Sequence, residues 1–364
     1  MKFFMPVKVF DEKDCVLNHA DEIGALGKKA LIVTGKGSAF SNGSYDDVIA
    51  ALKKQNTEYL TFSEVEENPS TDTVFEAVKR FSPENPDFVI GIGGGSPMDA
   101  AKAIALGLKH PEADIDYLYD ASKDASALPL VCVPTTCGTG SEVTGVSVLT
   151  RHDKKTKASM VHKVFPAYAL IDCKYLSSAP HSLIVNSSMD ALSHLLESVL
   201  NAKADDYVRM TAEAGLKMWE KTKDILTGDR KAGEDDLGLL MRSSCLAGMS
   251  IAQSGTTIPH SLSYTVTYDL SVPHGKAVSR FLPGYLAAAP EKERDELLKL
   301  SGFSGLDEFT GFVHRVFGDM EIPKEELQRS YEAVKDNTVK MKSASFELSH
   351  EVLRKIVFYG QDTI

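Results

Sequence analysis

The sequence predicts an α/β dinucleotide-binding domain followed by an all-helical domain. Three observations lead to this fold class. The first half alternates short β-branched runs with helical stretches, which is typical of a parallel sheet covered by helices. The second half contains long segments with helical apolar periodicity and no strand-like runs. The chain has 364 residues, 43% of them hydrophobic, which is enough for about two domains.

In the first half, expected strands and helices alternate regularly. We expect strands over 30–34, 59–62 and 87–92, and helices over 45–54, 71–81 and 97–108. Pro97 suits the first position of its helix, where no amide hydrogen bond is needed. Further strand-like runs cover 128–134, 143–150 and 167–172. This order predicts a doubly wound, nucleotide-binding sheet.

The strand pattern stops at a boundary over 177–180. Helical periodicity then covers 188–200, 206–221, 234–252 and 294–300. The predicted domains are therefore residues 1–178, which form the α/β domain, and residues 179–364, which form the helical domain.

Charge and termini restrict the class of partner. The formal net charge of −11 opposes binding to nucleic acid or to an anionic membrane, because both need a basic surface. We therefore expect a small-molecule partner. The N-terminal segment contains Lys2, Pro6 and Lys8, which predicts no signal sequence or membrane span there and a cytoplasmic protein. Five scattered cysteines without a CxxC pair suit reduced thiols.

Two loops after strands carry the residues that cradle phosphates. Segment 88–99 runs Phe-Val-Ile-Gly-Ile-Gly-Gly-Gly-Ser-Pro-Met-Asp from a strand into a helix, whose N-terminus favours an anion. The Rossmann fingerprint matches poorly, because Ser96 stands where its third glycine belongs. The segment alone also suits a glycine-rich turn in which Ser96 caps the helix. A second loop, Pro-Thr-Thr-Cys-Gly-Thr-Gly-Ser-Glu-Val-Thr over 134–144, makes a ligand site the better interpretation.

Four side chains suit a metal ion. Asp190 and His194 stand four residues apart in a helical segment and so share a face, while His260 and His274 each follow a proline. Alone, the first two could be a surface polar pair and the others hydrogen-bonded core histidines. Spacing does not show that they converge. Together, three imidazoles and one carboxylate suit Fe²⁺ or Zn²⁺ and leave a position for a substrate oxygen.

With these motifs in this order, the sequence closely resembles the iron-dependent (group III) alcohol dehydrogenases, which include butanol, 1,3-propanediol and lactaldehyde/propanediol dehydrogenases. The resemblance covers most of the chain. Its most specific pieces are Gly-Gly-Gly-Ser-Pro-Met-Asp-Ala-Ala-Lys over 93–102, the 134–144 loop and the Asp190, His194, His260 and His274 pattern. It implies one Fe²⁺ bound by these four residues, with Zn²⁺ or another divalent ion as the alternative, and an active site between the domains.

The resemblance also implies a set of cofactor-binding positions. They are Asn68, Gly94, Gly95, Ser96, Asp99, Thr135, Thr136, Thr139 and Thr144, with Lys157 near the nicotinamide ribose. No catalytic side chain is assigned. Many relatives have a further histidine four residues after the counterpart of His260, whereas this chain has Tyr264 there, so no histidine proton relay carries over. Tyr264 is either a hydrogen-bond partner or a core aromatic residue.

Gly35 predicts a preference for NADP(H), with NAD(H) as the alternative cofactor. In many relatives an Asp follows the first strand here, where it binds the adenosine ribose and repels a 2′-phosphate. Gly35 removes that repulsion, and donors for a phosphate follow at Lys36, Ser38, Asn42 and Ser44. Alternatively, Gly35 only makes a tight turn and both cofactors are accepted.

The activity implied is hydride transfer between NADP(H) and a small alcohol or aldehyde, with the metal as Lewis acid. Relatives are often dimers or larger, so we expect a homo-oligomer. Two other classes stay open. Dehydroquinate synthase and related lyases share this architecture and also combine a nicotinamide with a metal. A non-catalytic nucleotide-binding protein is the third possibility, although it would not need four intact ligand positions.

Overall fold

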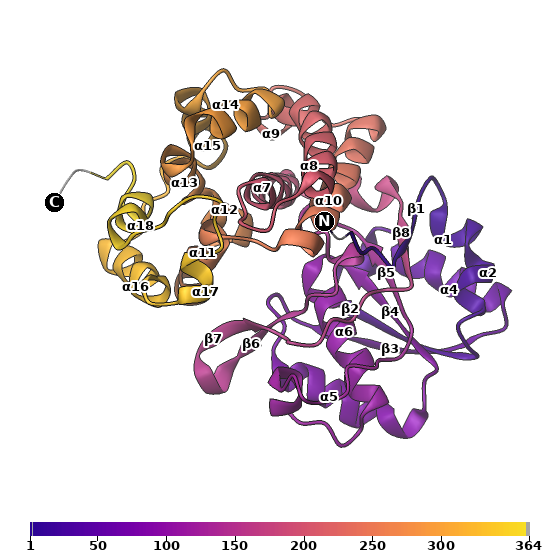
Figure 1. Ribbon diagram of the computed structural model, residues 1–364. Helices are drawn as coiled ribbons and strands as arrows, with labels where there is room; N and C mark the ends of the chain where they lie inside the picture. Colours follow the sequence, from indigo (N-terminus) through magenta and orange to yellow (C-terminus); the bar gives the residue numbers. More distant parts are fainter. Residues whose placement is uncertain (2, 362–364) are drawn as a thin grey trace. The chain divides into compact units, whose positions relative to one another are not determined.

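The computed structural model of the protein describes residue 1 and residues 3–361 (Figure 1). The chain divides into two units. The α/β unit is Met5–Ala179, and the helical unit comprises the described residues of Pro180–Ile364 and of Met1–Phe4. The predicted fold class, a parallel α/β domain followed by a helical domain, is confirmed. No helix within 1 and 3–361 has the length and apolar character needed to cross a bilayer.

The α/β unit is built on a six-stranded parallel sheet with the order β1-β8-β5-β4-β2-β3. From β2 the chain moves outward to β3 and then returns to β4 on the other side of β2. The point where the order reverses therefore lies between β2 and β4, and doubly wound folds bind ligands at the carboxyl ends of strands there. The strands are β1 (Lys8–Asp11), β2 (Lys29–Gly35), β3 (Glu58–Val65), β4 (Phe88–Gly93), β5 (Leu130–Pro134) and β8 (Tyr168–Ile171).

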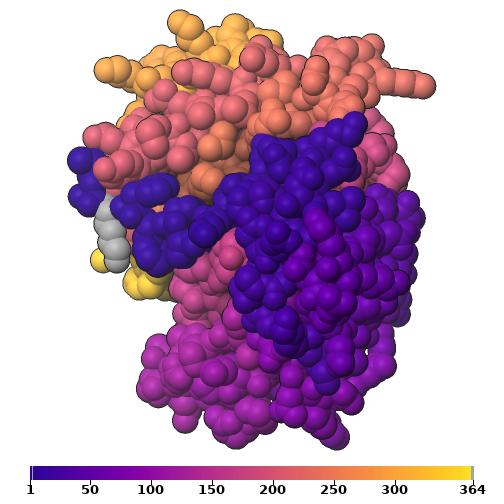
Figure 2. Space-filling model, turned by 90° about the vertical axis from the view of Figure 1, so that its right-hand side faces the viewer, coloured from indigo at the N-terminus to yellow at the C-terminus, as the bar shows by residue number. Residues whose placement is uncertain are grey.

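Helices cover both faces of this sheet. Leu31 and Val33 of β2 enter one hydrophobic core with α5 and α6, and Ala30 and Ile32 enter the other with α1, α2 and α4. In the space-filling view, N-terminal residues in indigo form much of the visible surface of this unit (Figure 2). Burial on both faces explains why the central strands are apolar throughout. The helices are α1 (Cys15–Asn18), α2 (Ala20–Gly24), α3 (Ser38–Ser41), α4 (Ser44–Lys54), α5 (Thr71–Phe81) and α6 (Gly95–Lys109).

Three details of this unit differ from the sequence prediction. Helix α6 begins at Gly95, so Pro97 is its third residue; proline is still tolerated, since amides of the first turn lack intrahelical partners. Of the strand expected over 143–150, only β6 (Val148–Arg151) forms. It pairs antiparallel with β7 (Thr156–Ser159), outside the main sheet. The short edge strand β1 was not predicted, because four partly exposed residues show too little pattern.

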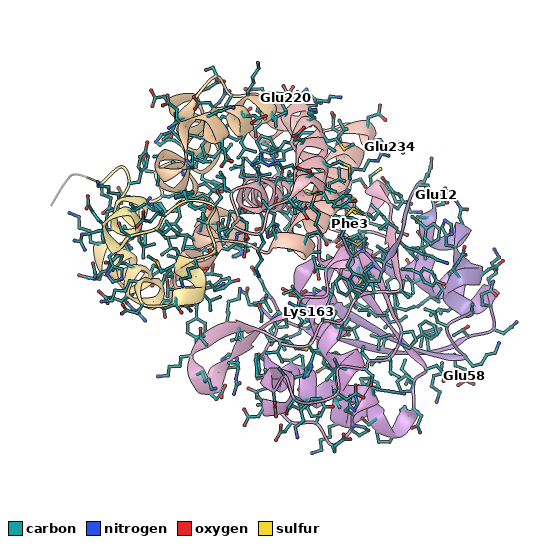
Figure 3. The ribbon with its side chains drawn as sticks, viewed as in Figure 1. Phe3, Glu12, Glu58, Lys163, Glu220 and Glu234 are labelled. Carbon is teal, nitrogen blue, oxygen red and sulfur yellow. The ribbon has the colours of Figure 1, made fainter. Side chains whose placement is uncertain are left out.

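The helical unit is organised around α7, which is buried at every position from Ser188 to Val199. Helices α8, α10 and α12 pack against it. The N-terminal residues belong to this unit because Phe4 exchanges backbone hydrogen bonds with the Gln253 side chain, and the Phe3 ring lies 5.4 Å from that of Tyr207 (Figure 3). The helices are α7 (His181–Val199), α8 (Asp206–Trp219), α9 (Lys223–Leu226), α10 (Glu234–Ser254), α11 (Ile258–Leu270), α12 (His274–Ser279), α13 (Leu282–Ala288), α14 (Glu291–Leu300), α15 (Leu306–Phe317), α16 (Lys324–Lys335), α17 (Thr338–Met341) and α18 (His350–Val357).

Candidate metal centre and dinucleotide site

The four predicted metal ligands lie on three helices of the helical unit. Asp190 and His194 project from one face of α7. His260 is the third residue of α11, directly after Pro259. His274 begins α12 after Pro273. The turn between α11 and α12 starts at Ser271, whose φ of 54° ends α11 in a left-handed conformation.

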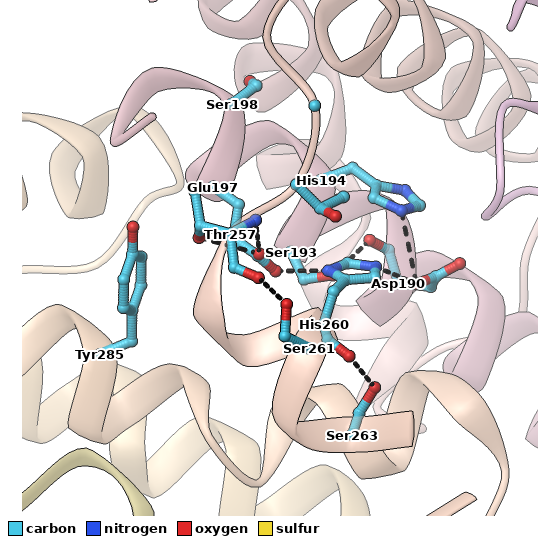
Figure 4. Close-up of polar contacts among 12 residues, drawn as sticks. Asp190, Ser193, His194, Glu197, Ser198, Thr257, His260, Ser261, Ser263 and Tyr285 are labelled. Carbon is cyan, nitrogen blue, oxygen red and sulfur yellow. Dashed lines mark hydrogen bonds and ion pairs between the residues drawn. The ribbon is translucent and has the colours of Figure 1, made fainter. Parts of the chain in front are cut away.

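The structure brings these four side chains together around one carboxylate oxygen. Figure 4 shows three of them, Asp190, His194 and His260. Asp190 Oδ1 lies 3.8 Å from His194 Nε2, 3.3 Å from His260 Nε2 and 3.7 Å from His274 Nε2. The rings of His194 and His260 are stacked at 4.5 Å between centroids. Potential ligand atoms of Asp190, His260 and His274 all lie within 4.8 Å of one another.

The donor set fits a divalent metal ion. Asp190 Oδ1 and His260 Nε2 are buried, and neither has a hydrogen-bond partner within the described chain. Buried polar atoms without a partner are costly, so their convergence points to a ligand that supplies the missing interaction. Burial opposes ionisation of Asp190, but its electrostatic interactions with His194 and His274 hold its pKa well below the usual range. The site therefore offers a carboxylate, the charge state that a metal needs.

Sequence reasoning missed Glu197, which supports His260 from the other side. Its Oε1 accepts the Nδ1–H of His260 at 2.5 Å, and its Oε2 accepts the amide and hydroxyl of Thr257 at 2.7 and 2.9 Å. Glu197 is fully buried on α7. Burial lowers the pKa of His260, yet Glu197 and Asp190 raise it to about 9 overall. The signal in the sequence was a charged residue inside the apolar run 195–200, three positions after His194.

Tyr264 lies one helical turn beyond His260 on α11 and is partly buried. Its ring is nearly parallel to that of His274, with 6.3 Å between centroids and 20° between planes. Tyr264 therefore lies beside His274, one of the four predicted metal ligands.

In the α/β unit, the predicted phosphate loops meet at the carboxyl edge of the sheet. Thr135, directly after β5, donates its amide to the carbonyl of Gly93 at 2.9 Å. A side-chain carbon at Gly94 would stand 3.1 Å from Thr136, and one at Gly95 would stand 2.7 Å from Thr139. A Cβ at Gly95 would force Thr139 to shift, and one at Gly94 would be tight against Thr136. The loop after β5 therefore packs directly on the start of the 15-residue helix α6, and a helix N-terminus favours an anion.

Asn68 joins three parts of this edge. Its φ of 57° is left-handed, a conformation that asparagine tolerates well. Its amide donates to Ser96 Oγ at 3.1 Å, and its Oδ1 accepts a hydrogen bond from Lys157 Nζ at 2.7 Å. Three of the predicted cofactor-binding residues are therefore in direct contact.

Asp99 and Thr144 both contact the side chain of Lys102, a residue that sequence reasoning also missed. The Lys102 side chain is fully buried, and its Nζ donates to Ser141 Oγ at 2.6 Å and to Thr144 Oγ1 at 3.3 Å. Asp99 Oδ1 accepts the Ser141 hydroxyl at 2.6 Å, and Asp99 Oδ2 accepts the Val148 amide at 2.9 Å. This network fastens the loop after β5 to α6.

Of the four donors expected around a 2′-phosphate, two are exposed and two are hydrogen-bonded within the protein. Gly35 is the last residue of β2, and Lys36 and Ser38 just after it are exposed. In contrast, the Ser44 hydroxyl is buried and donates to Asn42 Oδ1 at 2.7 Å, and Asn42 Nδ2 donates to the carbonyl of Tyr175 at 3.2 Å. Both of these donors are therefore engaged within the protein, whereas Lys36 and Ser38 face outward.

Comparisons with known proteins assign both units to one family. Residues 6–173 match the family model described as iron-containing alcohol dehydrogenase, and residues 184–358 match that of the C-terminal part of the Fe-containing alcohol dehydrogenase family. The chain is 32% identical to the NADPH-dependent butanol dehydrogenase of Clostridium saccharobutylicum, over 78% of this chain and 72% of the relative. It is 28% identical to the NADH-dependent butanol dehydrogenase A of Clostridium acetobutylicum, over 78% of this chain and 74% of that relative.

The match extends to solved structures. The iron-containing alcohol dehydrogenase of Thermotoga maritima superposes with a TM-score of 0.90 at 35% identity, over 98% of each chain. Some relatives are longer: the chain spans 34% of aldehyde-alcohol dehydrogenase 2 of Entamoeba histolytica, to which it is 30% identical over 80% of its own length.

Proposed function

Because this chain belongs to the iron-containing alcohol dehydrogenase family, we propose that it transfers a hydride between a nicotinamide cofactor and a small alcohol or aldehyde. In this proposal the helical domain, residues 179–364, holds the metal and the substrate. The α/β domain, residues 1–178, binds the dinucleotide.

The convergence of three imidazole nitrogens on Asp190 Oδ1 is the observation that carries the proposal. We assign Asp190, His194, His260 and His274 as the ligands of Fe²⁺ or another divalent ion. When bound, such an ion supplies Lewis acidity toward an alcohol or aldehyde oxygen, and the nicotinamide supplies the hydride acceptor or donor. The chain itself holds these groups and orients them, and no side chain is assigned as a general base.

In the α/β unit, we assign the pyrophosphate to the amides of Gly94, Gly95 and Ser96 at the start of α6. Thr135, Thr136 and Thr139 shape the same loop, and Asn68 and Lys157 act as a bonded pair near the nicotinamide ribose. Asp99 and Thr144 contribute by holding the loop through Lys102. Gly35 with exposed Lys36 and Ser38 supports NADP(H) as the preferred cofactor. The cytoplasmic location and the homo-oligomeric state stay predictions.

One assay tests the proposal. The protein is stripped of metal, and absorbance of NADPH and of NADH is followed with a panel of short-chain aldehydes before and after addition of Fe²⁺. We expect aldehyde-dependent oxidation of the cofactor that appears only with the ion, and faster turnover with NADPH. Turnover of a phosphorylated acid without net change in the nicotinamide would indicate a lyase instead. Cofactor binding without any turnover across the panel would indicate a non-catalytic protein.

A further inference from the structure

The buried carboxylate of Glu197 binds His260 on α11 and Thr257, the residue directly before α11, but it is not among the proposed ligands. One oxygen accepts the Nδ1–H of His260, and the other accepts both donors of Thr257. We propose that Glu197 is a positioning residue of the metal centre, which selects the nitrogen that His260 presents to the ion and fixes the start of α11 against α7. This inference rests on the proposed metal site.

The contact with Glu197 determines which tautomer His260 adopts. An ionised carboxylate only accepts hydrogen bonds, so the ring nitrogen facing Glu197, Nδ1, must carry the proton. When a binding ion displaces the proton from Nε2, that nitrogen presents its lone pair, and Nε2 is the atom that lies 3.3 Å from Asp190 Oδ1. Carboxylates that hold the second nitrogen of a ligating histidine in this way fix both tautomer and ring orientation.

Glu197 also links the two helices that carry Asp190, His194 and His260. Thr257 directly precedes α11, so Glu197 Oε2 lies at the N-terminus of that helix, where a negative charge is favourable. Asp190, His194 and Glu197 share α7. One side chain therefore joins the helix that carries two ligands to the start of the helix that carries His260. The ligands are held in register without help from the ion, so less ordering is needed when it binds.

Glu197→Gln keeps the shape of the side chain but cannot keep both contacts. If the amide oxygen faces Thr257, the amide NH₂ faces His260 and favours the tautomer with its proton on Nε2, toward the ion. If the oxygen faces His260, the NH₂ meets the Thr257 amide, which is also a donor. In either orientation one of the two functions is lost.

The experiment measures metal binding by itself. Metal-stripped wild type and Glu197→Gln are titrated with Co²⁺ in competition with a chromophoric chelator, and the visible absorption spectrum of bound Co²⁺ is recorded. We expect an affinity about 10- to 100-fold lower in the variant and a changed Co²⁺ spectrum. Glu326→Gln is the matched control, because it neutralises another buried carboxylate on α16, paired with Arg329 at 3.2 Å. It should leave affinity and spectrum at wild-type values.

A second variant covers the case in which Glu197→Gln does not fold. Glu197→Asp keeps the charge but is one methylene shorter, so it reaches only one of its two partners, and we expect an intermediate loss of Co²⁺ affinity. Wild-type affinity and spectrum in every folded Glu197 variant would overturn the inference while leaving the proposed function intact. Failure of the wild type to bind any divalent ion would instead refute the proposed metal site.

Discussion

Gly275 lies against the backbone of Asn186, so close that a side-chain carbon at position 275 would stand 1.9 Å from the Asn186 carbonyl oxygen. The amide of Lys276 also donates to Asn186 Oδ1 at 3.2 Å. Helix α12 therefore rests directly on α7. Because His274 immediately precedes Gly275, this contact holds His274 within 3.7 Å of Asp190.

The first prediction is that Gly275→Ala weakens the metal site without removing a ligand. The added methyl group must push α12 away from α7, which costs about 1–3 kcal/mol of stability by overpacking. We expect a lower Tm and at least about 10-fold weaker metal binding, since the ligand set loses its geometry. Thermal unfolding of the metal-free protein and chelator competition measure the two effects.

Gly311→Ala on α15 is the control, because nothing lies within 4 Å of its added carbon. Equal metal affinity in Gly275→Ala and Gly311→Ala would contradict this account.

The second prediction is that His260→Ala or His274→Ala removes both metal and turnover. A four-ligand site loses affinity steeply when one donor is removed. NADPH binding, followed by its fluorescence, should survive, because the dinucleotide residues lie in the other unit. Metal content is measured after dialysis, with His314→Ala on the exposed surface of α15 as the control. Full metal content in either variant would show that the ligand assignment is wrong.

The sequence predicted those elements whose signals are local. Helix α5 has the predicted bounds, because its amphipathic pattern coincides with a capping residue: Ser70 accepts the Thr73 amide at 3.1 Å. The expected strand over 143–150 formed only in its second half, since Ser141–Val143 makes a short 3-10 turn. β-branched residues there favour extended structure, but the buried Lys102 network outside the segment holds Ser141 and Thr144.

Side chains that act through distant partners escaped prediction. The four candidate ligands were identifiable as residue types, but only the fold shows that Asp190 and His274 meet across 84 positions of the sequence. Glu197 and Lys102 look like ordinary charged positions in helical segments. Their burial follows from partners 60 and 39 residues away, Thr257 and Ser141, which periodicity does not reveal.

The third prediction concerns the pH dependence of stability. Burial raises the pKa of Glu142 to about 7 from its ordinary 4.5, partly offset by Lys102. A raised pKa in the folded state means that the native protein holds this proton more tightly than the unfolded chain does. The resulting stability is fully present below pH 4.5 and is lost as pH rises through about 7. The loss amounts to roughly 3 kcal/mol for a shift of this size.

Glu142→Gln should therefore remove this dependence. We expect the variant to unfold at a higher temperature than wild type at about pH 8.5 and at a similar temperature at about pH 5. Thermal scans at both pH values measure the difference. Glu58→Gln, at an exposed position on β3, serves as the control and should differ from wild type equally at both pH values (Figure 3). A Glu142→Gln advantage that is the same at both pH values would show that Glu142 is charged in the native protein throughout this range.

The last prediction is that Gly35 sets the cofactor preference. Gly35 ends β2 beside the glycine-rich end of β4. Because Gly35 has no side chain, this position carries no carboxylate to repel a 2′-phosphate. A side-chain carbon there would lie 3.3 Å from the Val65 carbonyl oxygen, so a small residue fits after a slight adjustment.

We expect wild type to favour NADPH over NADH in kcat/KM on one aldehyde. Gly35→Asp should shift the ratio toward NADH by at least about 10-fold, because it places like charges together. Gly35→Asn has nearly the same shape without the charge, so it separates repulsion from crowding and should shift the ratio less. A wild-type ratio that favours NADH would overturn the preference. An unchanged ratio in Gly35→Asp would mean that Gly35 does not face the ribose and that the selectivity arises elsewhere.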